Sequence, residues 1–530
     1  MYQDKYQLTI DKLLTSSVRN NPNQQIVYSG VKTETYAGFK ETVYRLAKGL
    51  VSMGVKKGDR VAVFDYDTMN YLYLYYAVPL SGGVLHTVNI RYPPELIFYT
   101  MQHADDKFVI IRDEFVPIIE KSIPLFEFVK GWIVSSDAGE PVKMIEGATK
   151  LSDLMKGSAN TSLPEIDEND LATTFYTSGT TGMPKGVEFT HRQLVLHTLS
   201  AASALADPPI NMKSTDVIMP LVPMFHVHSW GTPYFVIMKG MKYVLPGKYN
   251  FETMPLVMKK EKVTVSLMVP SVLYMLINSK NSEIIKDLGI RTVIGGGALS
   301  KGLYKLAEQH GITANAGYGM SETAPILTLG LFSSDMLGLD EEHKLDLSLR
   351  AGIPIPLVDI RVVNKEGNEV KNDGKEIGEI IVRSPWLTRV YVKDPEGTQK
   401  LWKDDWMHTG DLAVVDKYGV VSIVDREKDA VKSGGEFIPT VVIEDAISTY
   451  PGVGEVAVIG KPDPKWQERP VAFISGLKEL DEKKMRDHLM KFVDSGRIAK
   501  FWIPDEFRLV DSFQKTSTGK IDKKVLREML

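Results

Sequence analysis

Cysteine is absent from this chain of 530 residues. Its absence excludes disulfides, cysteine–zinc sites and thiol catalysis, and it is typical of an intracellular protein. An excess of basic residues is also missing, because 63 Lys and Arg stand against 67 Asp and Glu. This balance argues against a protein whose main task is to bind nucleic acid. The length exceeds that of a single hydrophobic core, so we expect several domains.

A leader and a membrane span are not predicted either. The N-terminus, Met1–Gln7, carries an acid and no apolar run. Asn70–Ile90 is long enough to cross a bilayer, but Pro79, Gly82 and Gly83 interrupt it. We predict a buried helix that breaks near Pro79 and is followed by a strand. The prediction is a cytoplasmic protein with at most peripheral membrane contact.

Helical and extended patterns alternate through most of the chain. An apolar helical face runs from Phe39 to Met53, and a turn plus a strand follows at 57–64. This alternation indicates an α/β fold with largely parallel sheets, in two units. From Arg350 the strands become short and are separated by Gly and Pro, which predicts a small, mainly antiparallel β unit. A compact region of mixed strands and helices follows a boundary near 425–428.

A loop rich in glycine and hydroxyl residues lies between two predicted strands, Leu171–Tyr176 and Val187–Thr190. Its eleven positions, Thr177–Val187, hold three glycines, four hydroxyl residues and Lys185. Such a loop offers many N–H and hydroxyl donors to an oligophosphate. It is also compatible with an ordinary hairpin turn. The spacing of a Walker A loop is not present.

Five further clusters combine glycines, hydroxyls and charged groups: Pro223–Trp230, Ile294–Ser300, Gly317–Thr323, Trp406–Leu412 and Gln514–Asp522. Each has a plain structural alternative. The two histidines of the first cluster fit a core as well as a ligand site, and the glycines of the second fit a tight helix–strand contact. Glu322 would make chemical sense beside phosphates if it held Mg²⁺. The acid Asp411 could accept hydrogen bonds from ribose or be a solvated turn residue. The last cluster alone reads as a solvated tail.

Together, the order and spacing of these clusters resemble the acyl-adenylate-forming superfamily, from about Leu8 to the end. The clusters at 223–231 and 425–436 are most similar to medium- and long-chain fatty acyl-CoA synthetases. The resemblance implies a large N-terminal domain, 1–424, of two α/β subdomains plus a β-barrel-like subdomain. It also implies a small mobile α+β domain, 425–530. The implied reaction joins a fatty acid to CoA through an acyl-AMP, with ATP and CoA as co-substrates and Mg²⁺ as cofactor.

The resemblance also implies roles for individual residues. Lys520 would carry adenylation, His226 would lie beside the acyl carboxylate, Lys432 would serve the thioester step, and Glu322 with Thr177 would ligate Mg²⁺. Trp230 would gate the acyl tunnel, Lys428 would be the hinge, and Gly434, Gly435 and Glu436 would line the CoA channel. The implied nucleotide-binding set is Thr177, Ser178, Gly179, Thr180, Thr181, Gly182, Lys185, Gly295, Gly296, Gly297, Tyr318, Gly319, Ser321, Asp411 and Arg426.

Three positions depart from the pattern of long-chain relatives. Glu436–Pro439 lacks the Trp and Ser often found there, His228 replaces a smaller polar residue near the gate, and Asp425 replaces a glycine. His228 could narrow or polarise the tunnel entrance. Acyl chain length cannot be read from the residues. A short, branched or substituted acid therefore stays open, as does transfer to a carrier protein. A homodimer is compatible with the resemblance.

Overall fold

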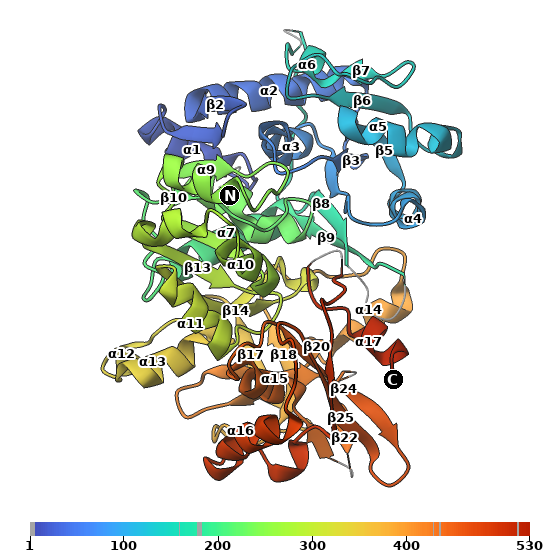
Figure 1. Cartoon of the computed structure of the whole chain (residues 1–530). Helices are drawn as coiled ribbons and strands as arrows, with labels where there is room; N and C mark the ends of the chain where they lie inside the picture. Colours follow the sequence, from blue (N-terminus) through green and yellow to red (C-terminus); the bar gives the residue numbers. More distant parts are fainter. Residues whose placement is uncertain (1–5, 158–159, 178–182, 428, 434–435, 517–518) are drawn as a thin grey trace, which may run out of the picture.

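The protein is described by a computed structural model covering residues 6–157, 160–177, 183–427, 429–433, 436–516 and 519–530. Figure 1 shows an elongated molecule, with the N-terminal α/β part at the top and the C-terminal part (red) at the bottom. Four sheets organise the described residues. The mixed α/β architecture agrees with the fold class predicted from the sequence.

The first sheet has seven strands and is parallel except at one edge. Its order is β7 (Thr149–Lys150), β6 (Gly131–Ser135), β5 (Asp106–Arg112), β3 (Arg60–Phe64), β4 (Val84–Thr87), β8 (Leu171–Tyr176) and β9 (Gly186–Thr190). β9 returns antiparallel to β8, with Tyr176 opposite Gly186. The glycine-rich loop therefore leaves and re-enters this sheet at its edge, as the two predicted strands require.

The second sheet has nine strands: β16 (Ile353–Pro354), β15 (Ile326–Leu329), β14 (Ile312–Gly319), β13 (Ile290–Ile294), β12 (Val265–Met268), β10 (Val217–Ile218), β11 (Lys242–Leu245), β1 (Gln25–Tyr28) and β2 (Lys32–Thr35). Its middle strands are parallel. The N-terminal hairpin β1–β2 joins this sheet because β1 pairs in parallel with β11. The two α/β units are thus tied together by the start of the chain.

Helices cover both sheets: α1 (Lys12–Asn20), α2 (Tyr36–Met53), α3 (Met69–Leu80), α4 (Pro94–Ala104), α5 (Val116–Ile119), α6 (Leu151–Leu154), α7 (His191–Ala204), α8 (Thr232–Met238), α9 (Met254–Glu261), α10 (Pro270–Ile277), α11 (Lys301–Gln309), α12 (Ser334–Leu337) and α13 (Glu341–Ser348). Their ends follow local chemistry. Thr35 caps α2 and Gly54 ends it in the left-handed region, while Thr190 and Gln193 form a capping box on α7.

The apolar stretch at 70–90 forms a buried helix and a strand. Almost every side chain of α3 is buried, Pro79 lies in its last turn, and β4 follows after two glycines. Its tyrosines pack edge to face, as Tyr75 and Tyr76 do against Tyr234. No helix among the described residues is long and apolar enough to cross a membrane.

The third sheet is antiparallel and is formed by β17 (Asp359–Val363), β18 (Gly378–Arg383), β20 (Trp406–Val415), β19 (Trp402–Lys403) and β21 (Val421–Arg426). The helix α14 (Pro395–Leu401) lies between β18 and β19 in the chain. The sequence predicts four strands in this unit, at 358–363, 379–383, 412–415 and 420–424. β20 instead begins at Trp406, so Asp411 lies within a strand. Arg426 is its partner across the ladder.

The last sheet contains β23 (Glu436–Ile438), β22 (Val431–Ser433), β25 (Gln467–Ile474), β24 (Val456–Asp463) and β26 (Glu506–Leu509). Three helices accompany it: α15 (Thr440–Ser448), α16 (Glu482–Asp494) and α17 (Lys523–Glu528). It has a hydrophobic core of its own, centred on residues such as Ile443, Val458 and Leu489. The chain changes from the third sheet to this one between Arg426 and Val431. The domain boundary at 425–428 stays a prediction.

Candidate active site

A cavity of about 2850 Å³ lies between the carboxyl ends of the second sheet, the third sheet and the C-terminal region. Ligands of α/β proteins commonly bind at the carboxyl ends of parallel strands. The cavity wall includes segments that follow β8, β13 and β14, together with the Gly519–Lys520 segment. Motifs that lie hundreds of residues apart in the chain therefore meet at one place.

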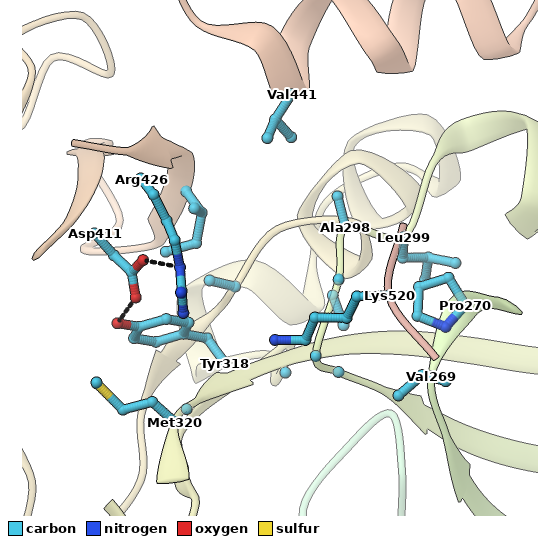
Figure 2. Close-up of a pocket in the computed structure, with 18 of the residues that line it drawn as sticks. Val269, Pro270, Ala298, Leu299, Tyr318, Met320, Asp411, Arg426, Val441 and Lys520 are labelled. Atoms are coloured by element: carbon cyan, nitrogen blue, oxygen red, sulfur yellow. Dashed lines mark hydrogen bonds and ion pairs between the residues drawn. The ribbon is translucent and has the colours of Figure 1, made fainter. Parts of the chain in front are cut away.

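One wall of the cavity is a hydrogen-bonded group of Tyr318, Asp411 and Arg426 (Figure 2). The Tyr318 hydroxyl donates to Asp411 Oδ2 at 2.7 Å, and Arg426 Nε donates to Oδ1 at 3.1 Å. The Asp411 carboxylate is buried. Burial, followed by the charge of Asp411, raises the pKa of Tyr318 well above its ordinary value, so this hydroxyl stays a donor. These two hydrogen bonds and the burial fix the position of the Asp411 carboxylate in the cavity wall.

Glycines let the cavity walls approach one another closely. A Cβ on Gly319 would lie 1.8 Å from the carbonyl oxygen of Pro325. A Cβ on Gly295 would lie 2.9 Å from Cη2 of Trp230, too close for a side chain, whereas a Cβ on Gly297 would meet Pro270 at 3.4 Å, an ordinary contact. Gly296 has a φ of +73°, which a side chain rarely adopts. The predicted glycine turn therefore serves close packing around the cavity.

Glu322 and Ser321 lie in a short 3₁₀ turn after β14, at the edge of the same cavity. The Glu322 carboxylate is buried, and its Oε1 accepts a hydrogen bond from the Tyr391 hydroxyl at 2.6 Å. Among the described residues no three His, Cys, Asp or Glu side chains gather as a metal cage. One carboxylate beside a phosphate site is nevertheless a donor set that suits Mg²⁺, which commonly binds through one or two carboxylates and the phosphates of its substrate.

The base of the glycine-rich loop is closed by its own ends. The Thr177 N–H donates to the carbonyl of Lys185 at 2.8 Å, and the Lys185 N–H donates back to Thr177 Oγ1 at 3.4 Å. Tyr92 donates to the Thr177 carbonyl at 3.0 Å. Both ends line the cavity. The predicted phosphate-binding residues Ser178, Gly179, Thr180, Thr181 and Gly182 lie outside the described residues.

Lys520 reaches the cavity from the C-terminal region. Figure 2 shows its side chain extending between Pro270 and Tyr318. Its Cε lies 3.5 Å from the position a Cβ on Gly296 would take. Ser271 Oγ donates to the carbonyl of Gly519 at 2.7 Å, which holds the preceding residue against α10. The predicted catalytic lysine and the predicted glycine turn are therefore in contact.

His226 and Trp230 both line the cavity, and their roles toward the acyl group stay predictions. Burial, then the charges of Lys520 and Arg91, lowers the pKa of His226 to about 3, so the ring is neutral at pH 7. Residues Val227–Trp230 have φ values of 45° to 56°, in the left-handed region. Such strain is retained where surrounding contacts impose it, often at functional sites. It turns the Trp230 ring onto Gly295.

The structure does not bring every predicted residue into this cavity. Lys432 is exposed on β22 and is not part of the cavity wall, and its N–H donates to Glu468. Lys428, Gly434 and Gly435 lie outside the described residues, and only the backbone of Glu436 is described, in β23. These assignments stay predictions.

His228 is not part of the cavity wall, in contrast to Trp230 two residues later. It is fully buried, its Nε2 lies 2.8 Å from Thr173 Oγ1, and it packs edge-on against Phe175 and Phe189. Burial lowers its pKa to about 3. The reason is the left-handed turn, which directs residue 228 into the core between β8 and β9 while Trp230 faces the cavity.

Sequence reasoning missed several residues of the cavity wall. Tyr391 contacts Glu322, Asp394 contacts Lys185, and Arg91 lies over the ring of Phe225, next to His226. The only sequence signal near them is the turn-like run Lys393–Pro395 before a helix. Nothing in that run indicates which distant residues it will meet.

The Tyr318–Asp411–Arg426 group, the two ends of the glycine-rich loop, Glu322 and Lys520 thus surround one cavity, as expected for an enzyme that activates a carboxylate with a nucleotide. Comparison with known proteins agrees. The family model described as "AMP-binding enzyme" matches residues 14–392, and that of the "AMP-binding enzyme C-terminal domain" matches 442–520. The chain belongs to the AMP-binding enzyme family.

Its curated relatives are acyl-CoA ligases. A long-chain-fatty-acid–CoA ligase of Thermus thermophilus is 38% identical over 94% of this chain and 90% of its own length. A 3-methylmercaptopropionyl-CoA ligase of Ruegeria pomeroyi is 34% identical over 100% and 98%. A medium-chain-fatty-acid–CoA ligase of Ectopseudomonas oleovorans is 34% identical over 98% and 96%.

Solved structures share the fold over nearly the whole chain. ATP-bound MatB from Rhodopseudomonas palustris matches with a TM-score of 0.83, 25% identity and 99% coverage of both chains. The anthranilate–CoA ligase AuaEII, solved with anthranoyl-AMP, matches with a TM-score of 0.84 over 98% and 97% at 21% identity. The protein is an AMP-forming acyl-CoA ligase by family.

Proposed function

We propose that this enzyme joins a medium- or long-chain fatty acid to CoA in two steps, through an acyl-adenylate. A carboxylate is a poor electrophile, so ATP first converts it to an acyl-AMP with loss of pyrophosphate. The CoA thiol then attacks the acyl carbon and AMP leaves. The observation that carries the proposal is the position of Lys520, which lies in one cavity with Tyr318, Asp411 and Glu322.

Lys520 would supply positive charge between the acid and the α-phosphate, where negative charge develops during adenylation. Asp411 and Arg426 would hold the ribose, with Tyr318 against adenine. Ser321 would reach the α-phosphate. Neutral His226 would donate to the acyl carboxylate without adding charge, and Trp230 would close the acyl side. Glu322, with Thr177, would hold Mg²⁺, which supplies charge neutralisation for the departing pyrophosphate when bound.

The second step would need a different arrangement. Lys520 occupies the space beside Gly296 that the thiol would have to approach, while Lys432 lies outside the cavity. We infer that the C-terminal domain, 425–530, turns about Lys428 between steps, withdrawing Lys520 and bringing Lys432 and Gly434–Glu436 inward. Two incompatible geometries at one site make such a movement necessary. The cytoplasmic location and a homodimer stay predictions.

A shorter, sulfur-containing acid is a second candidate substrate. It is favoured by the 34% identity to the Ruegeria pomeroyi 3-methylmercaptopropionyl-CoA ligase over 100% of the chain. The same cavity and the same nucleotide chemistry would serve both acids. The preference for one acid over the other would depend on how far the acyl-binding part of the cavity extends beyond Trp230.

An AMP-release assay tests the proposal. The enzyme is given ATP, Mg²⁺, CoA and one acid from a series of saturated fatty acids or 3-methylthiopropanoate. We expect sustained release of AMP and pyrophosphate only when all components are present, with the highest kcat/KM for a medium or long chain. Unchanged turnover without CoA would contradict the ligase reaction. The highest kcat/KM for 3-methylthiopropanoate would select the second candidate.

A further inference from the structure

Lys185, the cation of the glycine-rich loop, already has an anion beside it in the chain. Its Nζ lies 3.0 Å from Oδ2 of Asp394 and 4.5 Å from the centre of the Tyr391 ring. Asp394 and Tyr391 belong to one turn, 391–394, that precedes α14. Both residues line the cavity together with Lys185. The lysine is thus held by a carboxylate and an aromatic face from a distant part of the sequence.

The backbone fixes this pairing. The N–H of Val392 donates to the carbonyl of Gly186 at 2.9 Å, and Val187 forms a bridge with Tyr391. These contacts align the turn with β9, so that position 394 meets position 185. The other oxygen of Asp394, Oδ1, accepts from the N–H of Gly397 at 2.8 Å and caps α14. The carboxylate is therefore oriented by its helix as well as by Lys185.

Gly397 leaves the space in which the pair lies. A Cβ at this position would lie 2.1 Å from Asp394 Oδ2 and 2.6 Å from Lys185 Nζ. Any other residue would force the carboxylate and the ammonium to move. The glycine in the first turn of α14 therefore leaves room for the Lys185–Asp394 ion pair.

The pair is also easy to exchange. The side chains of Lys185 and Asp394 are 43% and 35% exposed, and an ion pair this open to water is weak. A pyrophosphate group carries more negative charge than one carboxylate and offers more acceptor oxygens. It can therefore take Lys185 away from Asp394, whereas after its departure the carboxylate is close enough to take the lysine back.

We propose that Asp394 is a positioning residue. Its carboxylate is an internal anion that holds the Lys185 ammonium before ATP binds and competes with pyrophosphate for that ammonium. This inference rests on the proposed function, in which pyrophosphate is the leaving group. Asp394 keeps the lysine at the cavity before ATP arrives, and it lowers the affinity for pyrophosphate after adenylation. Tyr391 connects the Lys185–Asp394 pair to Glu322, the residue proposed to hold Mg²⁺. Its hydroxyl donates to Glu322, and Lys185 Nζ lies over its ring.

The test is the affinity of the full-length enzyme for magnesium pyrophosphate, measured by calorimetry and as product inhibition of AMP release. Asp394→Asn keeps an oxygen that can cap α14 but removes the charge. We expect it to bind pyrophosphate about two- to fivefold more tightly, the range of an exposed ion pair. Because release is then slower, kcat should fall while the KM for ATP changes little or decreases.

Glu396→Gln is the matched control, because it removes an exposed acid two residues away that has no recorded contact with Lys185. It should leave the affinity for pyrophosphate unchanged. Lys185→Met should weaken pyrophosphate binding at least about tenfold, as expected for lost charge-assisted hydrogen bonds. In the Lys185→Met background, Asp394→Asn should have no further effect, since the two residues act through one contact.

Two results would overturn the proposal in different ways. If wild-type enzyme binds pyrophosphate and Lys185→Met weakens it, but Asp394→Asn matches wild type or Glu396→Gln, the internal-anion role is wrong and the proposed function stands. If wild-type enzyme neither binds pyrophosphate nor releases it from ATP, the proposed function fails, and the role of Asp394 fails with it.

Discussion

The two sides of the cavity are held in different ways. On the side proposed for ribose, defined by Tyr318, Asp411 and Arg426, the central carboxylate is 5% exposed and both of its oxygens accept hydrogen bonds. On the side proposed for phosphate, defined by Lys185, Tyr391 and Asp394, the corresponding carboxylate is 35% exposed. The Asp411 carboxylate is therefore buried, whereas the Asp394 carboxylate is open to solvent.

The difference indicates what each side has to do. A buried, bonded carboxylate keeps its geometry whether or not a ligand is present, because breaking its contacts leaves polar groups unpaired. An exposed pair contributes little to stability and can exchange partners. The ribose side thus suits a moiety that stays bound through both steps as AMP. The phosphate side suits a group that must leave after the first.

The largest effect is expected from Lys520→Ala, which removes the charge at the junction of the two sides. Acyl-AMP formation should fall by about 10²–10³, the usual loss for one positioned stabilising group. Thioester formation from supplied acyl-AMP should stay largely intact. Rapid-quench assays of each half-reaction measure both. Lys483→Ala, an exposed lysine on α16, is the control, and an equal loss in both steps would refute the division of labour.

Asp411→Asn and Asp394→Asn form the direct test of the comparison. The first weakens the contacts of a buried group, so it should lower the free energy of unfolding by about 1–3 kcal/mol and raise the KM for ATP. The second should change the free energy of unfolding by less than about 0.5 kcal/mol. Urea unfolding measures both variants. Equal destabilisation would show that the two sides are not held differently.

Trp230, which we propose lies at the acyl-binding side of the cavity, tests binding of the acid substrate separately from binding of ATP. Trp230→Ala removes the ring that lies on Gly295, and we expect roughly a tenfold change in the KM for acid or a shift in chain-length preference. The KM for ATP should change by less than about twofold, since the ribose side is untouched. Trp466→Ala, an exposed tryptophan, serves as control. A larger effect on ATP than on acid would remove Trp230 from the acyl side.

The last prediction concerns the pH dependence of stability. His228 has a native pKa of about 3, against about 6.5 in an unfolded chain. Below pH 6.5 the unfolded state therefore binds a proton that the native state does not hold, and stability falls as pH decreases toward 3. His228→Gln should reduce this slope by up to about one proton, near 1.4 kcal/mol per pH unit.

The measurement for His228 is the free energy of unfolding between pH 4 and 8. His343→Gln alters an exposed histidine and should leave the slope as in wild type. A slope for His228→Gln that equals the wild-type slope would contradict a neutral, buried ring at this position.

Local sequence patterns predicted much of the fold. The strand Leu171–Tyr176 and the helix ending at Gly54 are confirmed, because their signals are local: alternation of side chains, a cap and a left-handed glycine. The membership of β1 in the second sheet was not predicted. It depends on a parallel pairing of Ile26 with Tyr243, and such long-range pairing has no local signature.

The residues of the candidate site also fall into those that the sequence predicted and those that it did not. Motif spacing named Lys520, Glu322 and Asp411, and the structure places all three around one cavity. It could not find Tyr391 or Asp394, whose roles arise from the register between a turn and β9. It also could not show that His228 faces the core while Trp230 faces the cavity, because the left-handed turn sets their directions.

The central claim is that one cavity makes and holds an acyl-adenylate before CoA arrives. The most direct test is a single-turnover experiment with excess enzyme, radiolabelled ATP, Mg²⁺ and a fatty acid of suitable length, without CoA. We expect enzyme-bound acyl-AMP that accumulates toward one per ATP consumed and is converted to acyl-CoA and free AMP when CoA is added. Consumption of ATP only after CoA is present, or formation of ADP in place of AMP, would contradict it.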